Sequence, residues 1–276
     1  MGGHGSAVRR VLAVLLALIA ALSFVVGAVS LAARQTLYDP AKAPDVAARL
    51  LDEPAVRLAI AEKLVTRMQT IAPALRDRTD QLSQLAELLT TTEQFRVSFT
   101  AAVVALQRDL LEGGAPEVVL HLDDMLAALQ AGLIRTGGDL VIPEGQLTGV
   151  IVIDRDQVRA YRRLNDVTTQ TGWPSIAIGA AAAVCAVLVS DRRRRATFWV
   201  GATIAGAAIL ALGALALAKS AAAGQAQTEK GQAAVDAVWD VVARDIRMAL
   251  ALVLLLGLAG TVVGLSLQAF RRGGAS

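Results

Sequence analysis

The residues that could carry chemistry are few in this sequence. His121, followed by Asp123 and Asp124, is the grouping that comes nearest to a metal site. Neighbouring side chains in a step from strand to helix point to different faces, and protein zinc sites combine several histidine and cysteine ligands. We therefore interpret the grouping as structural and predict no metal. The other histidine, His4, lies in a glycine-rich N-terminal tail that we expect to be disordered.

Nucleophilic catalysis would need a Ser, Thr or Cys beside a His, often on a G-x-S-x-G elbow. The sequence contains no such elbow, no P-loop and no Rossmann glycine pattern. The single cysteine, Cys185, lies in a strongly apolar stretch, where we interpret it as a small apolar filler. We accordingly predict no catalytic residues and no cofactor, and expect a protein that is not an enzyme.

Composition indicates that much of the chain faces something other than water. Hydrophobic residues make up 55% of the sequence, above the roughly 45–50% of globular proteins. The net charge is +3, yet the segment 34–172 holds 15 basic and 19 acidic residues. The excess positive charge lies in short runs beside hydrophobic stretches, which is typical of a topology signal. We predict no nucleic-acid partner.

Four stretches are long and apolar enough to cross a bilayer, which takes about 20 residues. They cover residues 11–33, 173–190, 198–218 and 248–270, and none of them contains a charged residue. Ionisable groups inside spans are costly and mark ion or substrate pathways. The spans therefore indicate anchors rather than a coupled transporter, with the lipid bilayer as their partner.

Arginine-rich flanks predict the orientation. Basic residues concentrate in the short cytoplasmic loops of membrane proteins, so we expect segments 1–10, 191–197 and 271–276 in the cytoplasm of a plasma-membrane protein and segments 34–172 and 219–247 outside. The first span serves either as an anchor or as a cleaved signal peptide; its length favours the anchor. The arginines that set this topology are Arg9, Arg10, Arg192, Arg193, Arg194, Arg195, Arg271 and Arg272.

The segment 34–172 has a mainly helical pattern. Pro54 suits the first position of a helix in which apolar residues at 56, 60, 64 and 68 share one face, and Pro73 should kink or end it. Thr91 and Gln94 resemble a capping box that opens a second helix with Phe95 on its apolar face, ending at residues 113–114.

Two short β-type runs follow, Glu117–Leu122 and Gly149–Ile153, each with an aspartate, Asp123 or Asp154, placed to cap a following helix. We expect the runs to pair, since a lone strand leaves its backbone groups unsatisfied. The predicted fold class is thus a mainly α membrane protein with four transmembrane helices and a mostly helical outer domain that includes a small two-stranded β element.

Segment 219–247 carries apolar residues at helical spacing, including Trp239, and predicts an amphipathic helix before the last span. The helix either lies on the membrane surface or packs under the large domain, and its weakly basic polar face favours packing. Small residues let membrane helices approach closely. Two pairs therefore predict packing within the chain or between copies of it: Gly260 with Gly264, and Ala202 with Gly206.

Several stretches, LLDEPAVRLAIAEKL, FRVSFTAAVVALQRDLLEGG, VVLHLDDML, VIVIDRDQV and AVDAVWDVVARDIR, together with two spans joined by an arginine turn, resemble a family of uncharacterised actinobacterial membrane proteins. The resemblance implies four spans with the N-terminus inside and an extracytoplasmic helical domain. It implies no established activity and no catalytic residues.

The leading hypothesis for function is a non-enzymatic envelope protein whose outer domain senses, scaffolds or contacts another envelope protein or a second copy of itself. The alternative is a module that binds or handles lipids or small molecules. An enzyme would need polar residues that only the fold brings together.

Overall fold

The computed structural model describes residues 3–71, 73–112, 118–121, 150–153, 155–190, 193–224, 226 and 228–269. The chain divides into two compact units. Unit 1 comprises Met1–Gln35, Asp166–Ala218 and Ala243–Ser276, and unit 2 comprises Thr36–Asn165 and Lys219–Val242.

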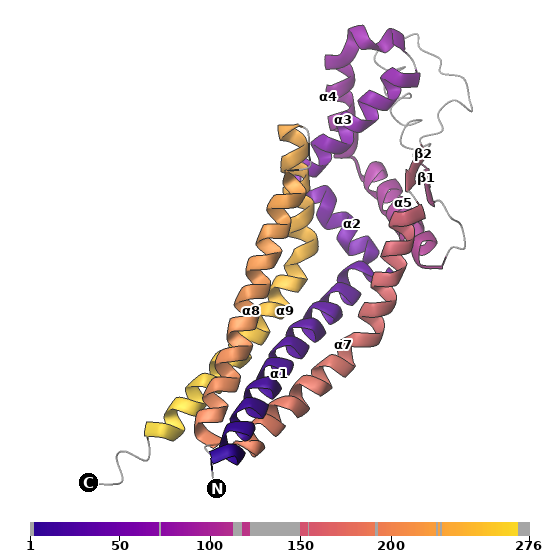
Figure 1. Cartoon of the computed structure of the whole chain (residues 1–276). Coiled ribbons are helices and arrows are strands. Elements are labelled where there is room, and N and C mark those ends of the chain that lie inside the picture. The colour runs from indigo at the N-terminus through magenta and orange to yellow at the C-terminus, as the bar shows by residue number, and fades with distance from the viewer. Residues whose placement is uncertain are drawn as a thin grey trace. The chain divides into compact units, whose positions relative to one another are not determined.

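Unit 1 is built from four long helices: α1 (Gly3–Leu37), α7 (Arg155–Val189), α8 (Arg193–Ala223) and α9 (Glu229–Ala269) (Figure 1). Each contains a stretch long and apolar enough to cross a membrane, namely Val11–Leu37, Val158–Val189, Arg195–Ala223 and Glu229–Ser266. The four predicted spans are therefore confirmed as helices of spanning length. The start of α1 and the end of α9 lie at the same end of unit 1 (Figure 1), as an even number of crossings requires.

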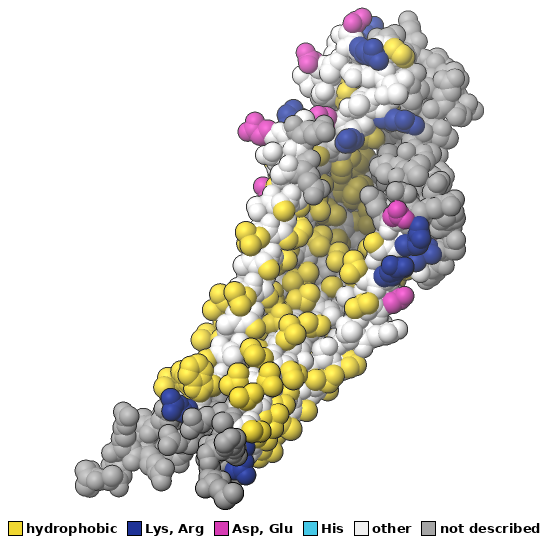
Figure 2. Space-filling view, in the orientation of Figure 1, with side chains coloured by type: hydrophobic (Ala, Val, Ile, Leu, Met, Phe, Trp, Pro, Cys, Tyr) yellow, Lys and Arg dark blue, Asp and Glu magenta, His cyan; other side chains and the backbone are white. Residues whose placement is uncertain are grey.

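The surface of unit 1 is apolar, as expected of helices that cross a membrane. Leu22 on α1, Leu210 on α8 and Leu252 on α9 are all at least 65% exposed. In Figure 2 hydrophobic side chains spread over the visible face of these helices. Large aliphatic side chains facing outward are expected of helices whose solvent is lipid.

Unit 2 contains α2 (Ala43–Asp52), α3 (Pro54–Ile71), α4 (Thr79–Thr90) and α5 (Glu93–Glu112), with single 3-10 turns at Pro40–Lys42 and Pro73–Arg78. Its core joins all four helices through Leu51, Leu64, Met68, Leu82 and Phe95, each at most 3% exposed. As predicted, Pro54 begins α3, and α3 ends just before Pro73. The predicted apolar face is confirmed, because Val56, Leu64 and Met68 are buried.

The start of α5 differs from the predicted capping box. The Thr91 hydroxyl donates to the Leu88 carbonyl (2.7 Å) at the end of α4. Thr92 takes the capping role instead: its Oγ1 accepts from the Phe95 backbone N–H (3.3 Å). Three consecutive threonine hydroxyls, from Thr90 to Thr92, bond back to α4 carbonyls. Such local bonds compete with helix continuation and separate α4 from α5.

The β component of the predicted fold class needs correction. The described structure is helical almost throughout. Its strands have only four residues each: β1 (Val118–His121) pairs antiparallel with β2 (Val150–Ile153). Two strands of four residues bury too little to form a layer of their own, so the fold class is α. The aspartates predicted to cap the following helices, Asp123 and Asp154, lie outside the described residues.

Three predicted boundaries also change, because the helices run further than the apolar stretches. The expected amphipathic helix and the fourth span are one helix, α9, since no Gly or Pro occurs between Gly231 and Gly257 to interrupt it. The second span is the later part of α7, which contains Pro174 in its interior. His4, expected in a disordered tail, is already inside α1.

Candidate functional site

One candidate site is an open cavity of about 840 Å³ within unit 1, lined by α1, by α8 and by the end of α7. Its apolar wall consists of small and medium side chains: Ala13, Val14, Ala17, Ala186 and Val200. Its polar lining is contributed by Arg9, Ser190, Arg195, Trp199 and Thr203. The alanines explain the space, because a methyl group on each of two facing helices cannot fill the gap between them.

The floor of the cavity is a packed cluster that involves all four helices of unit 1. Ala17, Ala186, Val200 and Ile204 are each at most 8% exposed, and Val253 of α9 packs against them. Interiors packed in this way resist rearrangement. The cavity wall is therefore held by the same contacts that hold the span helices together.

The charged rim of the cavity comes from two helix starts. Arg9 lies on the second turn of α1, Arg195 on the first turn of α8, and both side chains are exposed. Basic side chains are also seen where the apolar surface of these helices ends (Figure 2). Two of the eight arginines predicted as topology signals thus line one cavity.

The other polar groups of the cavity differ in what they can offer a ligand. Thr203 donates to its own helix, to the Trp199 carbonyl at 2.6 Å, so its hydroxyl proton is already used. Trp199 is 57% exposed and stands edge-on to Phe198, with ring centroids 5.7 Å apart. A Trp side chain that is more than half exposed suits the region between hydrocarbon and headgroups.

The remaining topology arginines are less completely described. Arg10 lies in α1, and Arg193 and Arg194 begin α8, but their side chains are outside the described part of the chain. Arg192, Arg271 and Arg272 lie outside the described residues altogether. For His121 the structure gives the backbone position, opposite Val150 in the β1–β2 pair. No group of three or more His, Cys, Asp or Glu that could hold a metal occurs among the residues that were searched.

The helix-packing residues reveal where α8 and α9 cross. A Cβ built on Gly264 would lie 2.7 Å from the Phe198 nitrogen, and one on Gly260 would lie 3.3 Å from the Gly201 Cα. Both glycines of the fourth span therefore face α8 closely, and they do so within one chain. Sequence reasoning missed Gly201 and Gly257, which approach most tightly: a Cβ on Gly201 would lie 2.6 Å from the Thr261 nitrogen.

The pair Ala202 and Gly206 is not the face by which α8 packs against α9 within the chain, and its predicted role between copies of the chain stays a prediction. A Cβ on Gly206 would meet nothing within 4 Å, so this glycine does not face α9. The packing face of α8 is one residue earlier, through Gly201 and Ala205; the latter is 6% exposed, and its nitrogen lies 2.6 Å from a Cβ built on Gly257. In a stretch so rich in alanine and glycine, two small-x-x-x-small rows run side by side, and spacing alone does not choose between them.

A second close crossing joins α1 and α7. A Cβ on Gly27 would lie 2.6 Å from the Ile176 side chain, and one on Gly179 would lie 3.3 Å from the Ala20 carbonyl. The Ser30 and Thr171 hydroxyls hydrogen-bond across this crossing at 3.3 Å. Small residues and hydroxyl pairs of this kind are the usual means of association between membrane helices.

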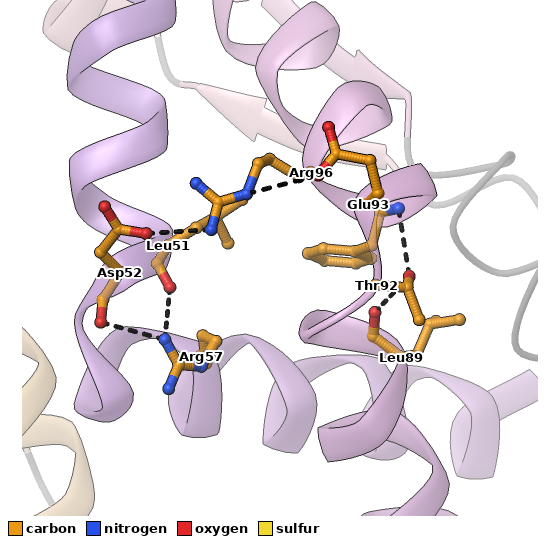
Figure 3. Close-up of polar contacts among 8 residues, drawn as sticks. Leu51, Asp52, Arg57, Leu89, Thr92, Glu93 and Arg96 are labelled. Carbon is orange, nitrogen blue, oxygen red and sulfur yellow. Dashed lines mark hydrogen bonds and ion pairs between the residues drawn. The ribbon is translucent and has the colours of Figure 1, made fainter.

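In unit 2 the polar clusters are structural. Figure 3 shows the Arg96 guanidinium of α5 paired with the Asp52 carboxylate at the end of α2, at 2.9 Å. Arg57 donates to two backbone carbonyls there, those of Leu51 (2.6 Å) and Asp52 (3.0 Å). The last carbonyls of a helix have no partner within it, so Arg57 satisfies the end of α2 and links it to α3.

A second polar cluster surrounds the carbonyl of Leu37, the last residue of α1. It accepts from the Tyr161 hydroxyl at 2.7 Å and from Gln107 Nε2 at 2.8 Å. The Tyr161 ring packs at 5.0 Å against Tyr38, and burial raises the pKa of the Tyr38 phenol. The end of α1 is therefore fastened to α5 and α7 by side chains that stay neutral at physiological pH.

No protein family, no curated protein and no solved structure matches this chain. The resemblance to actinobacterial membrane proteins thus stays a prediction. The class of protein follows from the structure itself: four helices long and apolar enough to span a bilayer define a multi-pass helical membrane protein.

Proposed function

We propose that the chain is a non-enzymatic envelope protein of the plasma membrane, whose helical unit 2 lies outside the cytoplasm and contacts another envelope component. The observation that carries this proposal is the separate core of unit 2. The cluster around Met68 and Leu82 contains no residue of the unit 1 cluster. A domain with its own core can present a defined surface, whereas helices that serve only as spans need no such domain.

The continuity of two helices supports a sensing role for the same unit. Helices α7 and α9 each contain residues of both units without a break in the helix. Helix α9 has 41 residues and is about 62 Å long, well beyond the roughly 30 Å of hydrocarbon. We propose that a continuous helix of this kind carries a displacement of unit 2 into the spans.

The test is site-specific photo-crosslinking in native membranes. A photoreactive residue replaces Leu88 of α4 or Val97 of α5, which are 65% and 61% exposed. Leu210 of α8, 75% exposed on a span, is the matched control that should face lipid. The proposal expects one defined protein adduct, another envelope protein or a second copy of the chain, from unit 2 positions and none from Leu210. Failure of every exposed unit 2 position to form an adduct would contradict it.

A second candidate function, lipid or small-molecule handling, is favoured by the cavity in unit 1. Ligand cavities in proteins usually have volumes of about 300–1,000 Å³ and an apolar lining with a few polar groups. At about 840 Å³, with Arg9 and Arg195 beside an alanine-rich wall, this cavity meets both criteria. Mass spectrometry of lipid that co-purifies with the full chain would test this candidate.

A further inference from the structure

The cavity in unit 1 combines two kinds of surface that one ligand would have to match. Arg9 and Arg195 provide two guanidinium groups from different helices, while Ala13, Val14 and Ala17 provide a continuous apolar strip along α1. Guanidinium groups bind phosphate oxygens through paired, charge-assisted hydrogen bonds. A molecule with a phosphate at one end and a hydrocarbon chain at the other would satisfy both surfaces.

The location of the cavity along the helices agrees with such a ligand. Arg9 lies two residues before the uncharged stretch 11–33, and Arg195 lies three residues before the uncharged stretch 198–218. Trp199 follows one helical turn later, at the depth where Trp side chains concentrate in membrane proteins. The cavity therefore lies at the level where lipid phosphates meet the acyl chains.

We propose that this cavity binds an anionic phospholipid, with its phosphate between Arg9 and Arg195 and the first part of an acyl chain against Ala13, Val14 and Ala17. A zwitterionic lipid would place its own ammonium group beside two guanidinium groups, which is unfavourable, so net negative charge is the selected property. Basic cavities between spans on the cytoplasmic side are suited to anionic headgroups, and the proposed orientation puts this end of unit 1 on that side. The inference rests on the second candidate function, lipid handling by this cavity, and names its ligand class; it does not depend on any partner of unit 2.

The test uses the full chain in nanodiscs that contain equal amounts of an anionic and a zwitterionic phospholipid, followed by release into detergent and native mass spectrometry. Wild type should retain anionic over zwitterionic lipid. Each basic residue near a membrane surface contributes about fivefold to the affinity for anionic lipid. The double variant R9Q/R195Q should therefore lower the preference by about 25-fold, and R9K/R195K should keep most of it.

Two matched variants separate a built site from a merely basic surface. R34Q removes an exposed arginine from the other end of α1 and should leave the preference unchanged. Ala13→Phe keeps both arginines but fills part of the apolar wall, so it should lower retention. Because Arg192, Arg193 and Arg194 remain in every variant, the topology signal of that flank is preserved.

Three results would overturn the proposal. The first is equal retention of anionic and zwitterionic lipid by wild type. The second is an equal effect of R34Q and R9Q/R195Q, which would indicate non-specific charge. The third is displacement of the bound lipid by millimolar glycerol phosphate, which would show that the cavity takes a soluble phosphate and does not require the acyl chain.

Discussion

The crossing of α8 and α9 gives the sharpest mutational prediction. Replacing Gly201 by Ala adds a Cβ 2.6 Å from the Thr261 nitrogen, 2.7 Å from the Gly257 carbonyl oxygen and 2.8 Å from the Gly260 carbonyl carbon. All three neighbours are backbone atoms of α9, so no side chain can rotate away. Ordinary contact begins at 3.4 Å, and the helices would therefore have to separate by about 0.8 Å (3.4 − 2.6) at this point.

Overpacking of this kind costs about 1–3 kcal/mol, while exchanging Gly for Ala in a helix returns up to about 1 kcal/mol. Gly206→Ala is the matched control, because it makes the same chemical change in the same helix with nothing within 4 Å of the new Cβ. The difference between the two variants cancels helix propensity. We expect Gly201→Ala to be about 1–3 kcal/mol less stable than Gly206→Ala.

The assay is reversible unfolding of the purified chain in mixed micelles, followed by the fluorescence of its three Trp residues. Gly257→Ala provides an independent repeat from the α9 side, since its Cβ would lie 2.6 Å from the Ala205 nitrogen. Equal stability of Gly201→Ala and Gly206→Ala would refute the reasoning. A larger loss for Gly206→Ala would show that α8 presents the Ala202 and Gly206 row to its neighbour instead.

Two further predictions concern unit 2. Arg96→Gln should lower the free energy of unfolding by less than about 1 kcal/mol, because the ion pair of Arg96 with Asp52 is exposed, at 41% and 62%. Arg57→Gln should lower it by about 1–3 kcal/mol, because the carbonyls at the end of α2 lose their charged donor. Thermal unfolding of the two variants tests whether the contact at the helix end contributes more than the exposed ion pair. Tyr161→Phe removes the hydroxyl that donates to Leu37, which should cost about 1 kcal/mol and increase hydrogen exchange near the end of α1; unchanged exchange there would contradict the fastening role.

The spans could be predicted because their signal is long and one-dimensional. Eighteen or more apolar residues without charge have few alternatives to a spanning helix, and all four predicted spans correspond to helices that fit. Their ends were harder to place. The apolar run of the fourth span begins near Met248, but the helix begins at Glu229, because charged residues such as Arg244 and Asp245 are compatible with a helix and mark only the membrane boundary.

Local patterns predicted helix faces better than helix contacts. The burial of Leu64 and Met68 follows from their four-residue spacing, since unit 2 has water on one side of α3 and a core on the other. Gly201 could not be chosen over Gly206 in the same way, because in α8 both faces are apolar and the choice depends on where α9 lies. Tertiary contacts of that kind produce no periodic pattern in the sequence from which they could be predicted.

The sequence predicts the basic residues of the candidate cavity but not its apolar wall. Arg9 and Arg195 were recognised as basic flanks, but their meeting around one cavity depends on α1 lying against α7 and α8. Ala13, Ala17 and Ala186 could not be predicted as lining residues, because alanine carries no reactive group and leaves a cavity only where the neighbouring helices do not fill the space. Whether these spans serve only as anchors or also form a binding site therefore depends on how the helices pack.

The central claim is a four-span protein with unit 2 outside the cytoplasm and both termini inside. Its most direct test is cysteine accessibility in intact cells, on a Cys185→Ala background that removes the single native cysteine. A cysteine at exposed Ser83 of α4 should react with a membrane-impermeant maleimide in intact cells, and one at Ser276 should react only after lysis. Labelling of Ser276→Cys in intact cells, with Ser83→Cys protected, would contradict the account.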